Sequence, residues 1–332
     1  MNRRKFLEIG LLSAIGLTGF PIISESSPLS NLENKLRNLI WISYSPTNYN
    51  PEQSVWPSQE SLRADIQTLY NAGIRGIVTY GANDALKNIP LSTRTSAKYQ
   101  KAVYQLNEVL KTAPLIAKQI GIEGFIMGVY NVYRDQTAGQ QEWNNAVAAK
   151  DYVDGYCIGN EGLYESWGWP NMNIIKQYMV DIKNTTGKPA TTSEQQEKYY
   201  NNDLLNTGDW LFPIIHPFWQ TPQIKDPQQG VNWTVDKYNW LKNISGGRFV
   251  MTKETGLPTA GDPSVNEQNQ YDFYKLLLTK GTPFCFFEAF DNYWKSWQPV
   301  EPYWGLWDKN RNPKKVVSLL GKSSVGEWMK YK

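Results

Sequence analysis

Residues 124–193 alternate short apolar segments with longer amphipathic ones, and the fold class follows from this alternation. Along the chain the segments are GFIMGV (124–129), QEWNNAVAAK (141–150), VDGYCIG (153–159), MNIIKQYMVDIKNTT (172–186) and ATTS (190–193). Short apolar runs are typical of buried strands, whereas the two longer segments have the apolar spacing of helices. Strands that alternate with helices in this way predict a parallel sheet covered by helices.

The same alternation extends to both sides of this stretch. Further strands are expected at 39–44, 74–80, 210–216, 248–252 and 284–287. Further helices are expected at 58–71, 97–120, 235–243 and 266–280. Eight strands, most of them followed by a helix, predict an α/β fold: a single-domain (β/α)8 TIM barrel over residues 29–332. The alternative is an open doubly wound sheet, but no glycine-rich dinucleotide turn follows the first strand.

The first 28 residues have the layout of an export signal followed by a spacer. Arg3-Arg4 and Phe6-Leu7 precede an apolar run at 9–23, which resembles a twin-arginine signal. The run is short for a stable membrane helix, which needs about 20 residues. The sequence therefore predicts a domain in the periplasm or outside the cell. An uncleaved N-terminal anchor is the alternative.

Composition excludes several classes of protein. The chain has 332 residues, a net charge of +3 and a mean hydropathy of −0.52, so it is neither a dedicated nucleic-acid binder nor a multi-span membrane protein. One histidine and two cysteines exclude a His-rich metal site and a disulfide framework. We expect no metal, no cofactor, and buried free thiols at Cys157 and Cys285. Aromatic residues reach 14%, which suits a protein that stacks flat ligands such as sugar rings.

Three carboxylates lie just past predicted strands. Glu161 follows the fourth strand, Glu254 the seventh and Glu288 the eighth. In (β/α)8 barrels the reactive groups lie at the carboxyl ends of the strands, so Glu161 and Glu254 are expected to face each other across one mouth. Two carboxylates in that arrangement can cleave a glycosidic bond, one as proton donor and one as nucleophile. The alternative is that both are solvated loop acids.

Four separated blocks resemble glycoside hydrolase family 17, the β-1,3-glucanases and lichenases of the clan A retaining glycosidases. The blocks are Ile77–Tyr80, Ile158–Glu161, Lys253–Gly261 and Phe286–Lys295 with Trp304–Trp307. Leu257 stands where the family usually has Trp. The segment 216–219 (HPFW) is more similar to bacterial and fungal members than to plant members, so a bacterial-type member is expected.

The resemblance implies a role for several residues. Glu161 would be the general acid/base, Glu254 the nucleophile, and Asn160 a hydrogen-bond partner of the sugar 2-hydroxyl. Glu288 would tune its neighbours, acting through Lys295, or would be a buried structural carboxylate. The remaining candidate substrate contacts, each with ordinary wall packing as the alternative, are Tyr44, Tyr80, His216, Trp219, Trp294 and Trp297.

The predicted function is a retaining hydrolase of β-glucan, most simply β-1,3-glucan, with no nucleic-acid partner and no obligate protein partner, acting as a monomer. A transglucosylase would use the same residues and pass the sugar to another glucan instead of to water. A non-catalytic glucan-binding protein is the second alternative, although such a protein would not need both carboxylates. A structural surface protein would account for neither the paired acids nor the loop tryptophans.

Overall fold

The computed structural model describes residues 27–50, 53, 55–81, 97, 101, 111–165 and 168–321. The strands are β1 (Trp41–Tyr44), β2 (Gly76–Thr79), β3 (Gly124–Val129), β4 (Gly155–Ile158), β5 (Ala190–Thr191), β6 (Thr252–Thr255) and β7 (Phe284–Phe286). The α-helices are α1 (Pro28–Asn38), α2 (Gln59–Asn71), α5 (Ala113–Ile120), α6 (Thr137–Ala148), α7 (Met172–Thr186), α8 (Asn202–Leu205), α9 (Pro227–Ile244) and α10 (Glu267–Leu278). The 3₁₀ helices are η2 (Gln196–Tyr200), η3 (Pro217–Trp219), η4 (Glu301–Tyr303) and η5 (Lys315–Leu319).

Two predictions fall mainly on other residues. The export signal predicted at 1–28 and most of the first half of the helix predicted at 97–120 lie outside the described residues. Among the helices that are described, none has both the length and the apolar character needed to cross a membrane.

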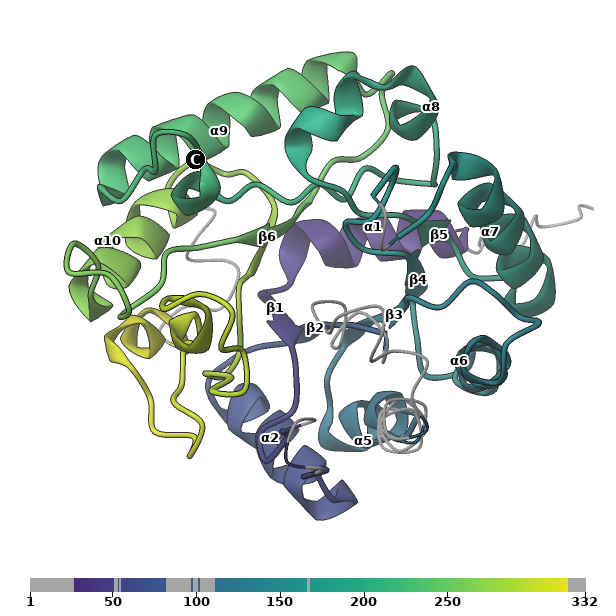
Figure 1. Cartoon of the computed structure of the whole chain (residues 1–332), viewed down its shortest axis with the longest axis horizontal. Coiled ribbons are helices and arrows are strands. Elements are labelled where there is room, and N and C mark those ends of the chain that lie inside the picture. The colour runs from purple at the N-terminus through teal and green to yellow at the C-terminus, as the bar shows by residue number, and fades with distance from the viewer. Residues whose placement is uncertain are drawn as a thin grey trace, which may run out of the picture.

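The seven strands form one parallel sheet in the order β5-β4-β3-β2-β1-β7-β6, and the helices surround it (Figure 1). Every strand pairing is parallel, which confirms the predicted parallel sheet. The sheet is curled into a half-barrel. Because its strands are parallel, their carboxyl ends lie at one rim. Residues that follow different strands are therefore brought together at that rim.

The strand predicted at 210–216 is not a regular strand. Isolated bridges join Gln195 to Ile214 on one side and Leu211 to Val250 on the other. This segment therefore lies between the end of β5 and the start of β6, and hydrogen-bonds to both sides of the gap. Pro213 stands in its middle and has no N–H to donate, so a continuous ladder cannot form there.

Other boundaries also differ from the prediction. The seventh predicted strand, 248–252, is displaced to Thr252–Thr255, and η2 and α8 lie within 194–209, for which the sequence analysis names no helix. Helix α1 was not predicted, although its start carries ordinary helix signals. The Ser27 hydroxyl accepts a hydrogen bond from the Ser30 N–H, and Pro28 follows it at the first helical position.

The Trp41 indole fills part of the interior of the sheet and packs on two glycines. Trp41 lies opposite Gly76 in the register of β1 and β2, and Gly76 lies opposite Gly124 in that of β2 and β3. A Cβ atom at Gly76 would come within 2.2 Å of the Trp41 ring, and one at Gly124 within 2.6 Å. The indole therefore fills the interior only because two neighbouring strands carry no side chain there.

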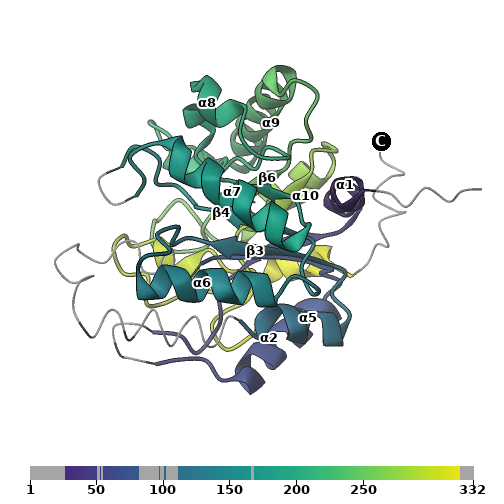
Figure 2. The same cartoon turned by 90° about the vertical axis from the view of Figure 1, so that its right-hand side faces the viewer.

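Helix α1 covers the amino-terminal ends of the strands. Leu32 and Leu36 pack into the interior cluster with Trp41, and the Lys35 ammonium donates to the Glu123 carbonyl, just before β3, and to the Asp154 carboxylate, just before β4. In Figure 2 the helix is seen end-on at one end of the sheet. The rim at the carboxyl ends of the strands is the opposite rim.

Removing the Leu36 side chain should measure how much this helix stabilises the domain. Leu36 is 1% exposed, so Leu36→Ala is expected to lower the free energy of unfolding by about 3 kcal/mol, through lost burial and a residual cavity. Urea unfolding gives the value. Leu115→Ala on α5, where the leucine is 38% exposed, should cost less than about 1 kcal/mol, and equal losses in the two variants would contradict the packing role of α1.

Candidate active site

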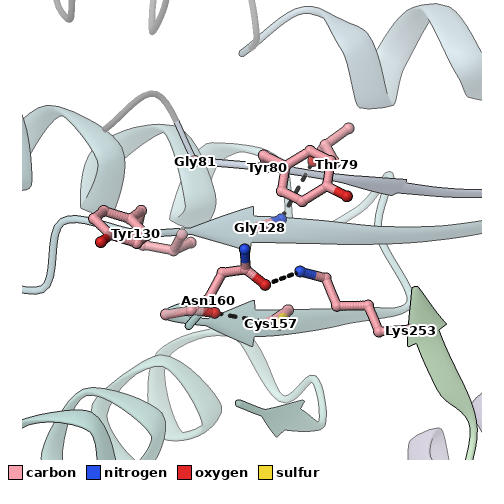
Figure 3. Close-up of a pocket in the computed structure, with 10 residues that line it drawn as sticks. Thr79, Tyr80, Gly81, Gly128, Tyr130, Cys157, Asn160 and Lys253 are labelled. Carbon is pink, nitrogen blue, oxygen red and sulfur yellow. Dashed lines mark hydrogen bonds between the residues drawn. The ribbon is translucent and has the colours of Figure 1, made fainter. Parts of the chain in front are cut away.

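A buried lysine joins the ends of β4 and β6. Lys253 and Glu254 lie on β6 and are 1% and 4% exposed. Glu254 Oε1 lies 3.1 Å from Lys253 Nζ, and Glu254 Oε2 lies 3.6 Å from His216 Nε2. The Lys253 ammonium also donates to Asn160 Oδ1, just beyond β4 (Figure 3). One cation therefore contacts both the candidate nucleophile and the residue next to the candidate acid/base.

A shift of register in β6 accompanies this arrangement. Thr252 pairs with Phe284 and Thr255 pairs with Phe286, so three residue steps on β6 match two on β7. In a regular strand successive side chains point to opposite faces of the sheet. An extra residue in one strand changes the direction of the side chains beside it, and such irregularities are common next to active sites. The extra residue falls at Lys253–Glu254, whose charged groups lie close together.

Glu161 lies in the loop after β4, half-buried and with a φ of 48°. Its Oε1 accepts a hydrogen bond of 3.0 Å from Gln195 Nε2. The buried carboxyl group of Glu194 accepts hydrogen bonds from the N–H groups of Gly162 and Leu163, at 3.0 and 2.9 Å. Burial raises the pKa of Glu194 to about 7, and the charge of Glu161 acts in the same direction. Glu194 therefore anchors the loop that carries Glu161.

Glu194→Gln is expected to make stability less dependent on pH. The pKa of this carboxyl group rises from 4.5 to about 7 on folding, so between these values the unfolded chain has released a proton that the folded chain retains. Stability therefore falls as the pH rises through this window. A glutamine retains an acceptor for Gly162 and Leu163 but does not titrate. The variant should gain about 3 kcal/mol relative to wild type between about pH 4 and about pH 8.

Urea unfolding over a pH series measures this difference. Glu197→Gln, which changes an exposed glutamate three residues away, should follow the wild-type curve. Parallel curves for wild type and Glu194→Gln would show that the buried carboxyl group does not titrate in this range.

Two buried ion pairs follow β7. The Glu288 carboxylate is fully buried and lies 2.7 and 2.9 Å from Lys295 Nζ, the pairing expected from the sequence. Burial raises the pKa of Glu288. Asp291 Oδ1 accepts from Lys314 Nζ at 2.6 Å, and burial raises the pKa of Asp291 to about 6. Both pairs hold the loop after β7 in one conformation.

Aromatic rings form a wall beside Glu254. The His216 ring makes edge contacts with Phe287 and Trp304, with centroids 4.8 and 5.2 Å apart. Trp219, on η3, lies 5.9 Å from Trp304. The structure thus brings His216 and Trp219 of the predicted site together with Glu254, and adds Trp304 to them.

A second group of rings, which we call the aromatic row, consists of Trp56, Tyr49, Trp294 and Trp297. Successive ring centroids are 5.7, 5.2 and 5.7 Å apart. The row extends from the segment after β1 to the loop after β7. Trp294 is almost buried, whereas Trp297 is 41% exposed. The two predicted tryptophans are therefore neighbours, at the end of an aromatic surface.

The two predicted tyrosines point in different directions. The Tyr44 hydroxyl donates to Asp65 Oδ2 on α2 at 2.9 Å, so this buried side chain faces the helices. The Tyr80 ring lies with its centroid 4.7 Å from Lys253 Nζ. Tyr44 pairs with Thr79 across the sheet, and Tyr80 is one residue further on. Because side chains alternate along a strand, one tyrosine faces out and the other in.

Tyr80 lines a shallow recess next to Lys253 (Figure 3). Its lining is Thr79, Tyr80, Gly81, Gly128, Val129, Tyr130, Cys157, Gly159, Asn160 and Lys253. In Figure 3 the Asn160 oxygen points to Lys253 and its nitrogen points toward Gly128. Cys157 and Cys285 are buried free thiols, as predicted. The described residues contain no group of three or more His, Cys, Asp or Glu placed to hold a metal ion.

Sequence reasoning missed several residues of this site. Lys253 was read only as part of a motif, although Phe249, Met251 and Lys253 alternate as the inward face of a strand does. Gln195 and Glu194 lie in the stretch where no element was clear. Tyr49 and Trp56 gave no sequence signal, because their place beside Trp294 depends on how the ends of the sheet meet.

Comparison with known proteins supports these observations. The model of the BtgE/BtgC glycoside hydrolase domain matches residues 92–305. The probable glucan endo-1,3-beta-glucosidase btgC of Aspergillus terreus is 28% identical over 212 residues, which are 52% of this chain and 31% of that protein. The chain thus spans about a third of the length of this curated relative.

Two solved structures share the fold. The glycoside hydrolase family 17 β-1,3-glucanosyltransferase of Rhizomucor miehei is 19% identical, with a TM-score of 0.62 over 83% of this chain and 95% of that one. An active-site mutant of the Rhizomucor miehei enzyme in complex with laminaritriose is 20% identical, with a TM-score of 0.62 over 84% and 96%. The family model covers more than half of the chain, including Asn160, Glu161 and Glu254. The chain belongs to the BtgE/BtgC glycoside hydrolase domain family.

Proposed function

We propose that this protein cleaves β-1,3-glucan with retention of configuration at the anomeric carbon, with Glu254 as nucleophile and Glu161 as general acid/base. The observation that carries the proposal is the Lys253 ammonium, which contacts Glu254 on β6 and Asn160 beside Glu161 after β4. Buried Glu254 lies between a cation and a histidine, an environment that favours a carboxylate. Half-buried Glu161 reaches solvent, from which a proton can be recovered.

The proposed reaction has two steps. In the first, a Glu254 oxygen bonds to the anomeric carbon, the bond to the leaving oxygen breaks, and Glu161 gives its proton to that oxygen. In the second, Glu161 removes a proton from water, whose oxygen attacks the same carbon, and the ester to Glu254 breaks. Asn160 would hydrogen-bond the sugar 2-hydroxyl, a contact that strengthens as positive charge develops on the ring.

The named relatives support the substrate class. The Aspergillus terreus relative is named as a probable glucan endo-1,3-beta-glucosidase, and the Rhizomucor miehei enzyme as a β-1,3-glucanosyltransferase. A laminaritriose complex is known for a mutant of the latter. These names concern those proteins, and they agree with the carboxylates and aromatic rings found here.

Product analysis tests the proposal. The protein is incubated with laminarin oligosaccharides, lichenan and cellulose, the products are sized, and the anomer released first is identified by NMR. We expect shorter laminarin products that first appear as the β-anomer. Release of the α-anomer, or a crystal structure with the Glu161 and Glu254 carboxyl groups about 6.5–9.5 Å apart instead of about 5–5.5 Å, would indicate inversion and refute the double displacement.

A transglucosylase is the second candidate function, and the aromatic row favours it. Trp297 is 41% exposed beside Trp294, so an indole face is available to hold a sugar. If this row holds the acceptor, a glucan hydroxyl takes the place of water in the second step. Products longer than the starting oligosaccharide would identify transfer, and Trp297→Ala should then lower the ratio of transfer to hydrolysis.

We further propose that the sheet closes into a (β/α)8 barrel, with 210–216 in the place of the sixth strand. The bridges of Leu211 and Ile214 to β5-side and β6-side residues support this reading. A crystal structure with an open edge at this segment would refute it.

We also propose that the chain is a bacterial-type member of its family. The segment 216–219 is more similar to bacterial and fungal members than to plant members.

Export by the twin-arginine pathway, and a monomeric state, are also proposed. The Arg3-Arg4 pair supports export, and cell fractionation of wild type and Arg3→Lys/Arg4→Lys tests it. Retention of the double variant inside the cell is expected. Light scattering tests the monomer, for which a mass near 38.1 kDa is expected when the whole chain, signal included, is measured.

A further inference from the structure

Lys253 has no assigned role, although it is the most unusual residue of the site. It is a lysine at 1% exposure on a strand whose preceding inward residues, Phe249 and Met251, are apolar. Lysine is almost never fully buried unless it is paired. Both of its polar contacts named above are to residues of the proposed machinery, Asn160 and Glu254.

We propose that Lys253 is a positioning residue that sets the orientation of the Asn160 amide and keeps Glu254 ionised. This inference rests on the proposed function and adds a role that the two carboxylates alone do not explain. The ammonium then affects the reaction itself and does more than stabilise the fold as an ion pair.

Lys253 determines which end of the Asn160 amide faces a ligand. An asparagine amide can present either its oxygen or its NH₂ group to a ligand, but a lysine ammonium is only a donor. The amide oxygen must therefore face Lys253, and the NH₂ group then points toward the recess, as Figure 3 shows. Asn160 is thereby fixed as a donor to a sugar oxygen. Replacing Lys253 removes the donor that holds the amide oxygen.

Lys253 also favours the ionised form of Glu254. Its Oε1 lies 3.1 Å from the ammonium in a site closed to bulk water, where a charge pair interacts more strongly than at a surface. A neighbouring cation favours the carboxylate form that attack on the anomeric carbon requires. Removing the cation should therefore require a higher pH before the enzyme becomes active.

Other titratable groups face the same space and must be considered. They are Glu254 on β6 itself, His216 after the 210–215 segment, Tyr80 after β2, Tyr130 after β3, Cys157 on β4, Glu161 after β4 and Cys285 on β7. Burial raises the pKa of Cys285 well above its usual value, and tyrosines are neutral at acidic pH. His216 is the group that could be confused with Glu254, because its ring nitrogen Nε2 lies 3.6 Å from Glu254 Oε2.

The experiment compares the pH dependence of kcat/KM for laminarin oligosaccharides in wild type, Lys253→Met and Lys253→Gln. Both variants are expected to lose on the order of 100-fold in kcat/KM at the wild-type optimum. Their acidic limb should move up by about one pH unit or more. The shift should persist when His216→Asn is added to both backgrounds. Lys253→Gln retains a polar group at this position, so it serves if the methionine variant does not fold.

A double-mutant cycle tests the contact with Asn160. If Lys253 acts through this amide, the losses caused by Asn160→Ala and Lys253→Met should not multiply. Measured above the acidic limb of every variant, where Glu254 is ionised in each, the double variant should fall within about threefold of the worse single variant. Multiplicative losses would overturn the orienting role.

Lys314→Met is the matched control, because it also removes a buried ammonium from a carboxylate, that of Asp291. It should lower thermal stability as Lys253→Met does but leave the acidic limb in place. An unmoved limb in both Lys253 variants, or an equal shift in Lys314→Met, would overturn the inference while the proposed function stands. A wild-type protein that neither cleaves nor elongates laminarin oligosaccharides would overturn both.

Discussion

Glu254→Gln is expected to lower the turnover of laminarin oligosaccharides by at least ~10⁴-fold while binding of the same oligosaccharides survives. An amide is isosteric with the carboxylate but cannot form the glycosyl ester, so the double displacement stops at its first step. Steady-state product assays and isothermal titration calorimetry measure the two effects. The variant also leaves the Lys253 ammonium beside a neutral group, so its melting temperature should be recorded alongside.

Glu123→Gln provides the matched control for this variant. Glu123 is exposed and lies just before β3 at the opposite end of the strands, and its carboxylate forms a loose pair with Arg75 at 3.7 Å. Its activity should equal that of wild type. Substantial residual turnover in Glu254→Gln would assign the nucleophile to another residue, and loss of both turnover and binding in a folded variant would leave the catalytic role without support.

Glu161→Ala is expected to lower activity on laminarin oligosaccharides by about 10²–10⁴-fold, the usual contribution of a general acid. The loss should shrink for aryl glucosides whose leaving phenol is a strong acid, because such a group departs without protonation. Added azide should restore turnover of these substrates and give the β-glucosyl azide, since the small anion needs no general base in the second step. NMR of the product identifies the azide.

Glu165→Gln, in the same loop, is the comparison for Glu161. Glu165 pairs with Lys198 at 2.6 Å on the surface, and this exposed pair should contribute little. No response to azide in Glu161→Ala, with equal losses on good and poor leaving groups, would contradict the acid/base role. Glu194 would then be the next candidate, because its carboxyl group accepts hydrogen bonds from the loop that carries Glu161.

The alternation of strands and helices could be predicted from the sequence because the spacing of apolar residues is a local property. Strand β3 and helix α7 were predicted with the bounds that the structure has. The 210–216 segment was misjudged because an apolar run containing Pro213 was treated as a full strand. Helix α1 was missed because its two buried leucines, Leu32 and Leu36, matter only once they meet Trp41 in the interior.

The sequence indicates candidate site residues only where a motif stands at the end of a predicted strand. Glu161, Glu254 and Asn160 follow from motif and position, but Lys253 depends on the register shift in β6, which no local pattern announces. The two tyrosines show the same limit. Tyr44 and Tyr80 both end apolar runs, yet a difference of one residue in register sends the first to Asp65 and the second to Lys253.

The position of α1 has a practical consequence for handling this protein. Because the helix covers the amino-terminal ends of the strands, a chain attached to a bead or sensor surface through Ser27 would turn its opposite rim, with the carboxylates and tryptophans, outward. Immobilisation from this end should therefore leave long polysaccharides free to reach that rim, whereas coupling through side chains on the loops after β4 or β7 should obstruct them.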